Sequence, residues 1–311
     1  MLRPGGPPGG WPTIRRARLL RFSRYRAAVI QAPGTGRPAE LDPETSRWLA
    51  WHEAVSHGLL GREVRDLGDA VMLYDPNDRE PFWNRLAGVA WPVDPAAFDR
   101  RLLEVIALFA SLDRTPHIWP LPGFDEPLDL TERLLSAGFD DSGAGLLMAH
   151  DPEWGTGAVT LRDRPDVAVE RVHLTAGSAA DRAARGIAVV LAEAFGVETY
   201  RIRAIEEETL ALLGRDVFHA VLIRVDGEPA ATARRTTFAG ASYLSSIGTR
   251  PAFQGRGLGR VATEIALQDA VESGSRWTYL GVFDDNLVAR RMYESLGFVV
   301  LGGPAPDLLL R

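Results

Sequence analysis

Two stretches in the second half of the chain carry residue types and spacings suited to chemistry on a phosphorylated ligand. The first runs from Ser246 to Arg260 and places glycines at positions 255, 257 and 259. Glycines at alternate positions let the backbone bend tightly and turn its N–H groups toward one point. An apolar helical pattern follows, and the first amides of a helix lack partners and carry partial positive charge. The pattern consists of Leu258, Val261, Ala262, Ile265 and Val271. This stretch is therefore predicted to cradle phosphate oxygens.

Two common phosphate motifs do not fit this loop. In the dinucleotide fingerprint Gly-x-Gly-x-x-Gly the third glycine stands one position later than Gly259 does here. The P-loop needs a lysine, and all 35 cationic side chains of this chain are arginine. The pattern that fits, Gln254-x-x-Gly257-x-Gly259, resembles the Gln/Arg-x-x-Gly-x-Gly/Ala signature of the GCN5-related N-acetyltransferases (GNAT). The resemblance implies that the loop holds the pyrophosphate of acetyl-coenzyme A.

The second stretch runs from Asp284 to Phe298 and resembles the second motif of the same family, Asn-x-x-Ala-x-x-x-Tyr-x-x-x-Gly-Phe. The matching residues are Asn286, Ala289, Tyr293, Gly297 and Phe298. Asn286 suits a helix N-cap and Gly297 a helix C-terminus. An ordinary amphipathic helix would explain the apolar face of this segment. It would not explain why both motifs occur in the family's order.

The resemblance implies acyl transfer from acetyl-coenzyme A to a primary amine by direct attack, without a metal. A backbone N–H from Ile247 to Thr249 would polarise the acyl carbonyl. Tyr293 would be the general acid that protonates the departing thiolate. A phenol has a pKa of about 10 and a thiol about 8.5, so this transfer is close to balanced. The alternative for Tyr293 is simple packing between helix and sheet.

The remaining predicted contacts are to the cofactor. Gly248 would let the pantetheine arm lie close to its strand, and Asn286 would contact the pantetheine region besides capping its helix. Arg256 and Arg260 either meet phosphate oxygens or face water. The predicted cofactor-binding set is Ile247, Gly248, Thr249, Gln254, Gly255, Arg256, Gly257, Leu258, Gly259, Arg260 and Asn286.

No general base is assigned from the sequence. The central strand predicted for Ala241 to Thr249 contains no glutamate, the residue that many family members use there. Several side chains remain open as candidates, and Glu206 to Glu208 also lie in the region that lines the acceptor site in the family. These candidates are Glu206, Glu207, Glu208, His219, Ser245, Asp284 and Asp285.

Composition narrows the function further. The chain has no cysteine, which excludes disulfides, cysteine zinc ligands and a cysteinyl acyl-enzyme. A net charge of −6 argues against a dedicated nucleic-acid binder. No apolar run is long enough to span a bilayer. We expect a cytoplasmic protein whose partner is a small-molecule or peptide amine, with no nucleic-acid or membrane partner.

At 311 residues the sequence predicts two domains of the α/β (α+β) class, each a mixed, mostly antiparallel sheet flanked by helices. Residues 1–40 form an Arg/Pro/Gly-rich flexible tail, for which a membrane-surface helix at 13–30 is the alternative. Residues 41–150 form a degenerate GNAT-like domain, residues 151–166 a linker, and residues 167–311 the catalytic GNAT domain. The first domain has Trp91 to Pro95, without glycine, where its phosphate loop would lie, so we expect it not to bind the cofactor.

His52 and His57 do not form the zincin motif His-Glu-x-x-His, because one extra residue separates them. That residue rotates the second histidine by about 100° on a helix, so both are predicted to be ordinary helix residues. Two rival functions stay open: a non-catalytic acyl-coenzyme A sensor or scaffold, and another acyl-coenzyme A reaction such as O-acylation or decarboxylation.

Overall fold

The computed structural model describes residues 18–19, 31–59, 61–156, 164–173 and 175–311. Most of the predicted tail and the middle of the predicted linker lie outside these residues. The strands are β1 (Arg18–Leu19), β2 (Glu63–Asp66), β3 (Val71–Tyr74), β4 (Arg85–Ala87), β5 (His117–Trp119), β6 (Asp140–His150), β7 (Val167–Val172), β8 (Phe218–Val225), β9 (Glu228–Phe238), β10 (Ala241–Thr249), β11 (Trp277–Phe283), β12 (Phe298–Val300) and β13 (Ala305–Leu309). The helices are α1 (Pro43–Gly58), α2 (Pro95–Ser111), α3 (Leu130–Ser136), α4 (Gly177–Ala194), α5 (Ile202–Leu212), α6 (Leu258–Glu272) and α7 (Leu287–Glu294).

Within the described residues, the strands join into one 13-stranded sheet. Its order is β1-β2-β3-β4-β5-β13-β6-β11-β10-β9-β8-β7, and β12 pairs with β6. The neighbours are antiparallel except at β4–β5 and β10–β11, which are parallel. The predicted class, a mixed and mostly antiparallel sheet flanked by helices, is confirmed.

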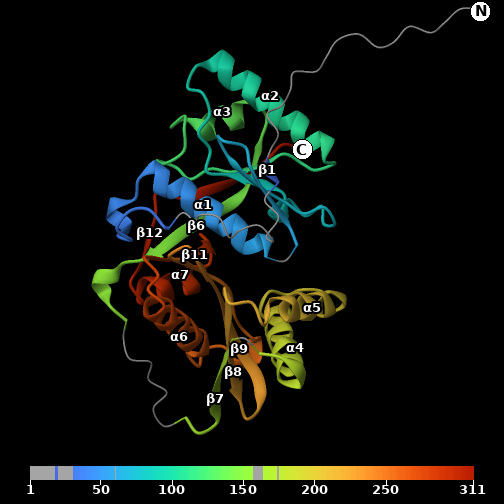
Figure 1. The fold of residues 1–311 in the computed structure, drawn as a ribbon, viewed down its shortest axis with the longest axis vertical. Coiled ribbons are helices and arrows are strands. Elements are labelled where there is room, and N and C mark those ends of the chain that lie inside the picture. Colours follow the sequence, from blue (N-terminus) through green and yellow to red (C-terminus); the bar gives the residue numbers. More distant parts are fainter. Residues whose placement is uncertain (1–17, 20–30, 60, 157–163, 174) are drawn as a thin grey trace, which may run out of the picture.

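The two halves of the chain exchange strands near the middle of this sheet. Strand β6 comes from the N-terminal half but pairs with β11 of the C-terminal half. Strand β13, at the end of the chain, returns to pair with β5. Figure 1 accordingly shows the C-terminus beside α2 in the upper lobe. The division into domains at residues 150 and 167 stays a prediction.

The sheet has two distinct faces in its C-terminal half. Paired residues of neighbouring strands point to the same side, and one such row is Phe218, Thr236, Tyr243 and Tyr279. Its members pack against α1, α4 and α5. The adjacent row, His219, Arg235, Leu244 and Leu280, lies on the opposite side, where α6 packs. We call these the α1/α5 face and the α6 face; Figure 1 shows the helices on the two sides.

Local sequence explains where the main helices begin. Asp42 caps α1 by accepting a hydrogen bond from Thr45 N, and Pro43 occupies the first helical position. Asp94 and Pro95 play the same parts at α2. Helix α4 buries a stripe of small and branched side chains, among them Ala183, Ile187 and Leu191, against the α1/α5 face.

One expectation needs correction. Residues 31–40, assigned to the flexible tail, pack on the C-terminal half: Ala32 is buried, its N–H donates to Ala239 O, and the Trp277 indole donates to Pro33 O. These buried contacts order the segment although its Pro/Gly-rich composition predicts flexibility. Strand β4 is short, Arg85–Ala87, because Pro81–Trp83 turns as a 3-10 helix before it.

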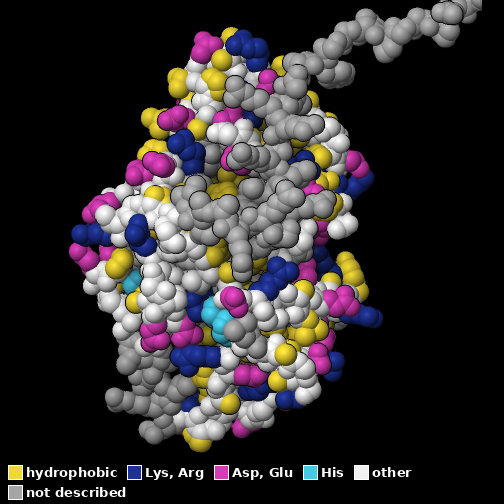
Figure 2. Space-filling model, in the orientation of Figure 1, with side chains coloured by type: hydrophobic (Ala, Val, Ile, Leu, Met, Phe, Trp, Pro, Cys, Tyr) yellow, Lys and Arg dark blue, Asp and Glu magenta, His cyan; other side chains and the backbone are white. Residues whose placement is uncertain are grey.

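Acidic and basic side chains are interspersed over the face shown in Figure 2, rather than gathered by sign. Within the described part of the chain, no helix combines the length and hydropathy that crossing a bilayer requires.

Candidate functional site

The parallel pair β10–β11 opens into a slot. Its register runs from Ala241↔Trp277 to Leu244↔Leu280 and ends there. Beyond Leu244, β10 keeps pairing with β9 but no longer with β11, and Gly281 and Phe283 of β11 are exposed. One edge of Ser245–Thr249 therefore faces an opening between two strands, where an extended ligand arm can pair with the backbone.

A β-bulge shapes the wall of this slot. The register with β9 shifts between Ser245 and Gly248, and Ser246 adopts a left-handed φ of 50°. Such a conformation is uncommon for a residue with a Cβ and is often found at functional sites. The amide of Arg250 donates to Ala230 O, so the preceding amide, of Thr249, points to the other edge, toward the opening. Thr249 lies within the range predicted to polarise the acyl carbonyl.

The glycine loop follows this strand directly. Gly255 and Gly257 have φ values of 73° and 74°, which favour glycine, and a Cβ built on either would meet no atom. Gly257 is the N-cap of α6 and offers no side-chain cap. The amides of Gly255 to Arg260 donate to no acceptor among the described residues. The loop thus presents N–H groups that no described residue engages at a helix N-terminus, and its role as a phosphate cradle stays a prediction.

The side chains around the loop are held in place by local pairs. Arg256 lies 2.7 Å from Asp166, just before β7. Arg260 pairs with Glu264 at 2.8 Å and donates to Ser295 Oγ, which ties α6 to α7. Gln254 Nε2 lies 3.4 Å from Thr249 O and so braces the turn. Both arginines are partly exposed, within reach of a phosphate at the loop.

Tyr293 lies at the apex of the slot on the α6 face. It packs in one cluster with Leu244 and Leu280, the last pair before the strands separate. Its hydroxyl makes no hydrogen bond to a described residue, and burial raises the pKa of the phenol.

Asn286 occupies the N-cap of α7 as the sequence predicts. Its Oδ1 accepts a hydrogen bond from Ala289 N at 3.2 Å. The cap places Asn286 at the end of β11, beyond the exposed Phe283. Its contact with the pantetheine region stays a prediction.

The matching slot of the N-terminal half is closed by the chain itself. Strands β4 and β5 are parallel at Leu86↔Ile118 and Ala87↔Trp119. Beyond them, Glu126 fills the gap: its N–H donates to Val89 O and its C=O accepts from Trp91 N. The Asp125 carboxylate also accepts from Val89 N and Leu121 N, so it ties the two strand ends together.

The helix after the closed slot is also unfit for phosphate. Asp94 caps α2 by accepting from Ala97 N at 2.9 Å, which places a carboxylate where Gly257 leaves α6 bare. The negative charge of Asp94 would repel a phosphate at this helix N-terminus, and its hydrogen bond already occupies the Ala97 N–H. That this half does not bind the cofactor stays a prediction.

Behind the slot, the N-terminal half places a charged cluster on the α1/α5 face. The His57 ring lies 5.5 Å from the Tyr243 ring, and its Nε2 lies 2.8 Å from Glu53 Oε1. Glu53 is also paired with the buried Arg85. Burial raises the pKa of the Glu53 carboxyl, but the Arg85 guanidinium and His57 together lower it to about 2. An ionised carboxylate therefore sits against an imidazole.

Sequence reasoning set His57 aside because it tested only a metal motif. The signal that could have found it is Glu53 four residues earlier, since residues at i and i+4 share a helix face. Among the described residues, no group of three His, Asp or Glu side chains is arranged to hold a metal ion.

The base candidates named from the sequence are dispersed. His219 is on the α6 face in a separate pocket, while Glu206 and Glu207 pair with Arg185 and Arg203 on the outside of the protein. Glu208 points toward the N-terminal half, 3.5 Å from Arg62. Ser245, Asp284 and Asp285 flank the slot on β10 and after β11.

Comparison with known proteins bears on this geometry. Residues 187–298 match the acetyltransferase (GNAT) family, a range that includes the slot, the glycine loop and Tyr293. A mycothiol acetyltransferase of Nocardiopsis dassonvillei is 40% identical over 75 residues, which is 24% of this chain. The match spans only 19% of that relative's length.

Two solved structures share the architecture over most of the chain. A GCN5-related N-acetyltransferase from Kribbella flavida is 25% identical, with a TM-score of 0.62, over 85% of this chain and 95% of that one. A tandem GNAT protein from the clavulanic acid biosynthesis pathway is 13% identical, with a TM-score of 0.55, over 80% of this chain and 78% of that one. The second likeness is one of fold.

Proposed function

Because residues 187–298 match the acetyltransferase (GNAT) family, we propose that this chain transfers an acetyl group from acetyl-coenzyme A to a primary amine. The observation that carries the proposal is the contrast between the two parallel strand pairs. The C-terminal pair opens beside an uncapped glycine loop, and the N-terminal pair is filled by Glu126 beside a capped helix. Only the first can accept a pantetheine arm and its pyrophosphate.

The residues of the slot divide the chemistry among them. The amides of Gly255 to Arg260 bind the pyrophosphate, and the open edge of β10 orients the pantetheine. A backbone amide of the Ile247–Thr249 segment that faces the opening donates to the oxyanion that forms when the amine attacks. Tyr293, at the apex, donates its proton to the departing thiolate.

We assign the role of base to His57, which the N-terminal half contributes. The ionised Glu53 carboxylate lies 2.8 Å from the imidazole Nε2 and holds the ring by charge attraction. Tyr243 contacts His57 edge to face, and burial raises the pKa of that phenol, so the hydroxyl stays protonated. The acceptor amine then approaches on the α1/α5 face.

Further polar groups on this face bear on the acceptor. Arg234 pairs with Ser245 across the sheet and donates to Thr209 Oγ1, while its Nε has no partner in the described structure. Glu208 lies close enough to raise the pKa of Arg234, which burial lowers to about 10. A carboxylate at the rim attracts a cationic amine, and so we propose a small-molecule or peptide amine as acceptor.

The test is mass spectrometry of a reaction between the purified chain, acetyl-coenzyme A and a mixed panel of primary amines. Release of free coenzyme A together with an acetylated amine is the expected result. An acyl-coenzyme A sensor would bind the cofactor and release no coenzyme A with any amine. O-acylation or decarboxylation would give products of different mass, and either would refute amine acetylation.

A further inference from the structure

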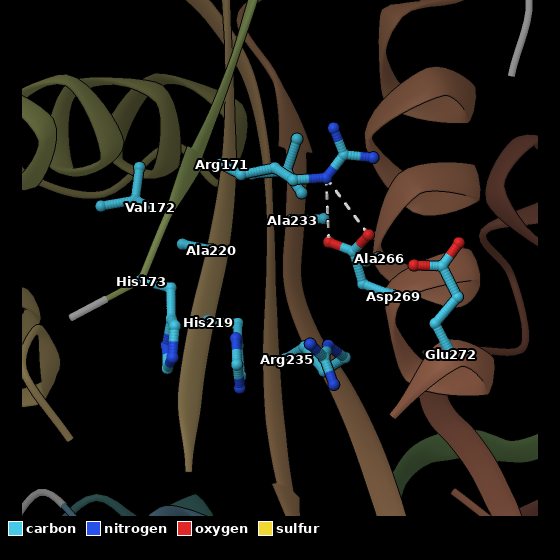
Figure 3. A pocket seen from close by; sticks show the side chains of 11 residues that line it. Arg171, Val172, His173, His219, Ala220, Ala233, Arg235, Ala266, Asp269 and Glu272 are labelled. Atoms are coloured by element: carbon cyan, nitrogen blue, oxygen red, sulfur yellow. Dashed lines mark hydrogen bonds and ion pairs between the residues drawn. The ribbon is translucent and has the colours of Figure 1, made fainter. Parts of the chain in front are cut away.

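A pocket of about 350 Å³ lies on the α6 face, away from the slot. It is bounded by the ends of β7, β8 and β9 and by the last turns of α6, as Figure 3 shows. None of its lining residues belongs to the predicted acetyl-coenzyme A set. The volume is at the low end for small-molecule sites.

Arg235 forms the floor of this pocket and lacks an anionic partner. Only 4% of the residue is exposed. Its Nη1 donates to Thr237 Oγ1 at 2.6 Å and to Ser273 Oγ at 3.3 Å, but its Nε is buried without a hydrogen-bond partner in the described structure. Burial lowers the pKa of Arg235, which the Asp269 carboxylate raises again. A buried guanidinium with no ion pair is costly, and a ligand carboxylate would offset that cost.

The opposite wall carries negative charge. The Nε of Arg171 lies 3.2 Å from both carboxylate oxygens of Asp269, so these two neutralise each other. Glu272, on the last turn of α6, is exposed and pairs with no described residue. Figure 3 shows Glu272 across the pocket from the histidines. A ligand with only a negative charge would be repelled by Glu272, and a ligand with only a positive charge would be repelled by the buried Arg235.

Two stacked imidazoles complete the pocket. The rings of His173 and His219 lie 4.0 Å apart at an angle of 16°. His173 Nδ1 donates to Phe218 O. Burial, together with the charges of Arg235 and His173, lowers the pKa of His219 to about 4, so that ring is neutral near pH 7. The stacked pair therefore offers a flat aromatic wall beside Arg235.

We propose that this pocket is a second ligand site that binds a free amino acid, with the carboxylate on Arg235 and the ammonium facing Glu272. The side chain of the ligand lies along the His173–His219 stack. This site is separate from the acetyl transfer slot and does not depend on the proposed reaction.

Calorimetry on the full-length chain without acetyl-coenzyme A tests the proposal. The probes are L-amino acids, the matched carboxylic acids that lack the amino group, and the matched amines that lack the carboxylate. We expect at least one amino acid to bind, and its two matched analogues to bind at least about tenfold more weakly, as loss of a charge partner predicts.

Two variants locate the binding. Glu272→Gln, on the surface, should weaken binding of the amino acid and leave the affinity for the matched carboxylic acid unchanged. Arg235→Gln should abolish binding of both, and acetyl-coenzyme A affinity should stay normal in each variant and so report intact folding. The proposal is overturned if no amino acid binds at millimolar concentration, if the acids bind as well as the amino acids, or if Glu272→Gln leaves amino-acid affinity unchanged.

Discussion

Replacing Tyr293 with Phe tests the catalytic assignment most directly. The change removes one oxygen from a side chain that is 5% exposed and keeps the ring in its contact with Phe298. No hydrogen bond to a described residue is lost, so the free energy of unfolding should change little. Loss of a general acid should lower turnover by about 10²-fold, or ~2.7 kcal/mol of transition-state stabilisation.

Tyr279→Phe is a matched control. Tyr279 is also fully buried on a neighbouring element, but its hydroxyl lies 2.8 Å from His52 Nδ1 and 3.3 Å from Leu49 O. Removing it leaves buried polar atoms unpaired, which costs roughly 1–3 kcal/mol of stability. The two variants should therefore have opposite effects. Tyr293→Phe should lower turnover and leave stability unchanged, and Tyr279→Phe should lower stability and leave turnover unchanged.

The assay measures turnover by release of the coenzyme A thiol, affinity for acetyl-coenzyme A by calorimetry, and stability by chemical denaturation. A transition-state role lowers the turnover number while cofactor affinity stays near normal. If Tyr293→Phe keeps turnover within about twofold of wild type, Tyr293 only packs between helix and sheet. In that case the thiolate is protonated by another group or by water.

Three further results are expected. Gly257→Asp should weaken acetyl-coenzyme A binding roughly 10- to 100-fold, because charge-assisted hydrogen bonds of ~1.5–3 kcal/mol are lost. The control for backbone strain is Gly274→Asp, because Gly274 has a similar φ in an equally open turn. Calorimetry measures the affinity of both variants. Equal acetyl-coenzyme A affinity of the two variants would show that the pyrophosphate does not bind at this loop. Titration of the intact chain should give one acetyl-coenzyme A per chain, and two equivalent sites would contradict the closed slot at Glu126. His57→Gln should lower turnover while acetyl-coenzyme A affinity stays near normal, whereas unchanged turnover would assign His57 to packing.

Local spacing along the chain predicts the turn, the cap and the helices of the C-terminal candidate site. The turn at Gly255 and Gly257, the cap at Asn286 and the helix carrying Tyr293 depend on residues within a few positions of each other. Backbone conformation and capping act over that range, so the pattern predicts the loop, the helix starts and the strand β10 that precedes them. The predicted fold class follows from the same alternation of elements.

Tertiary structure decides the rest, because it depends on contacts between residues far apart in the chain. Strand β13 pairs with β5 and β6 and so places the end of the chain in the N-terminal half. No local pattern at Ala305–Leu309 specifies these partners. Glu126 closes the first slot only because its loop returns to Val89. His57 reaches Tyr243, and Arg235 faces the pocket between β7 and α6, because strand pairing and helix packing bring them there. A residue's neighbours across a sheet are set by register and burial, which a short window of sequence does not contain.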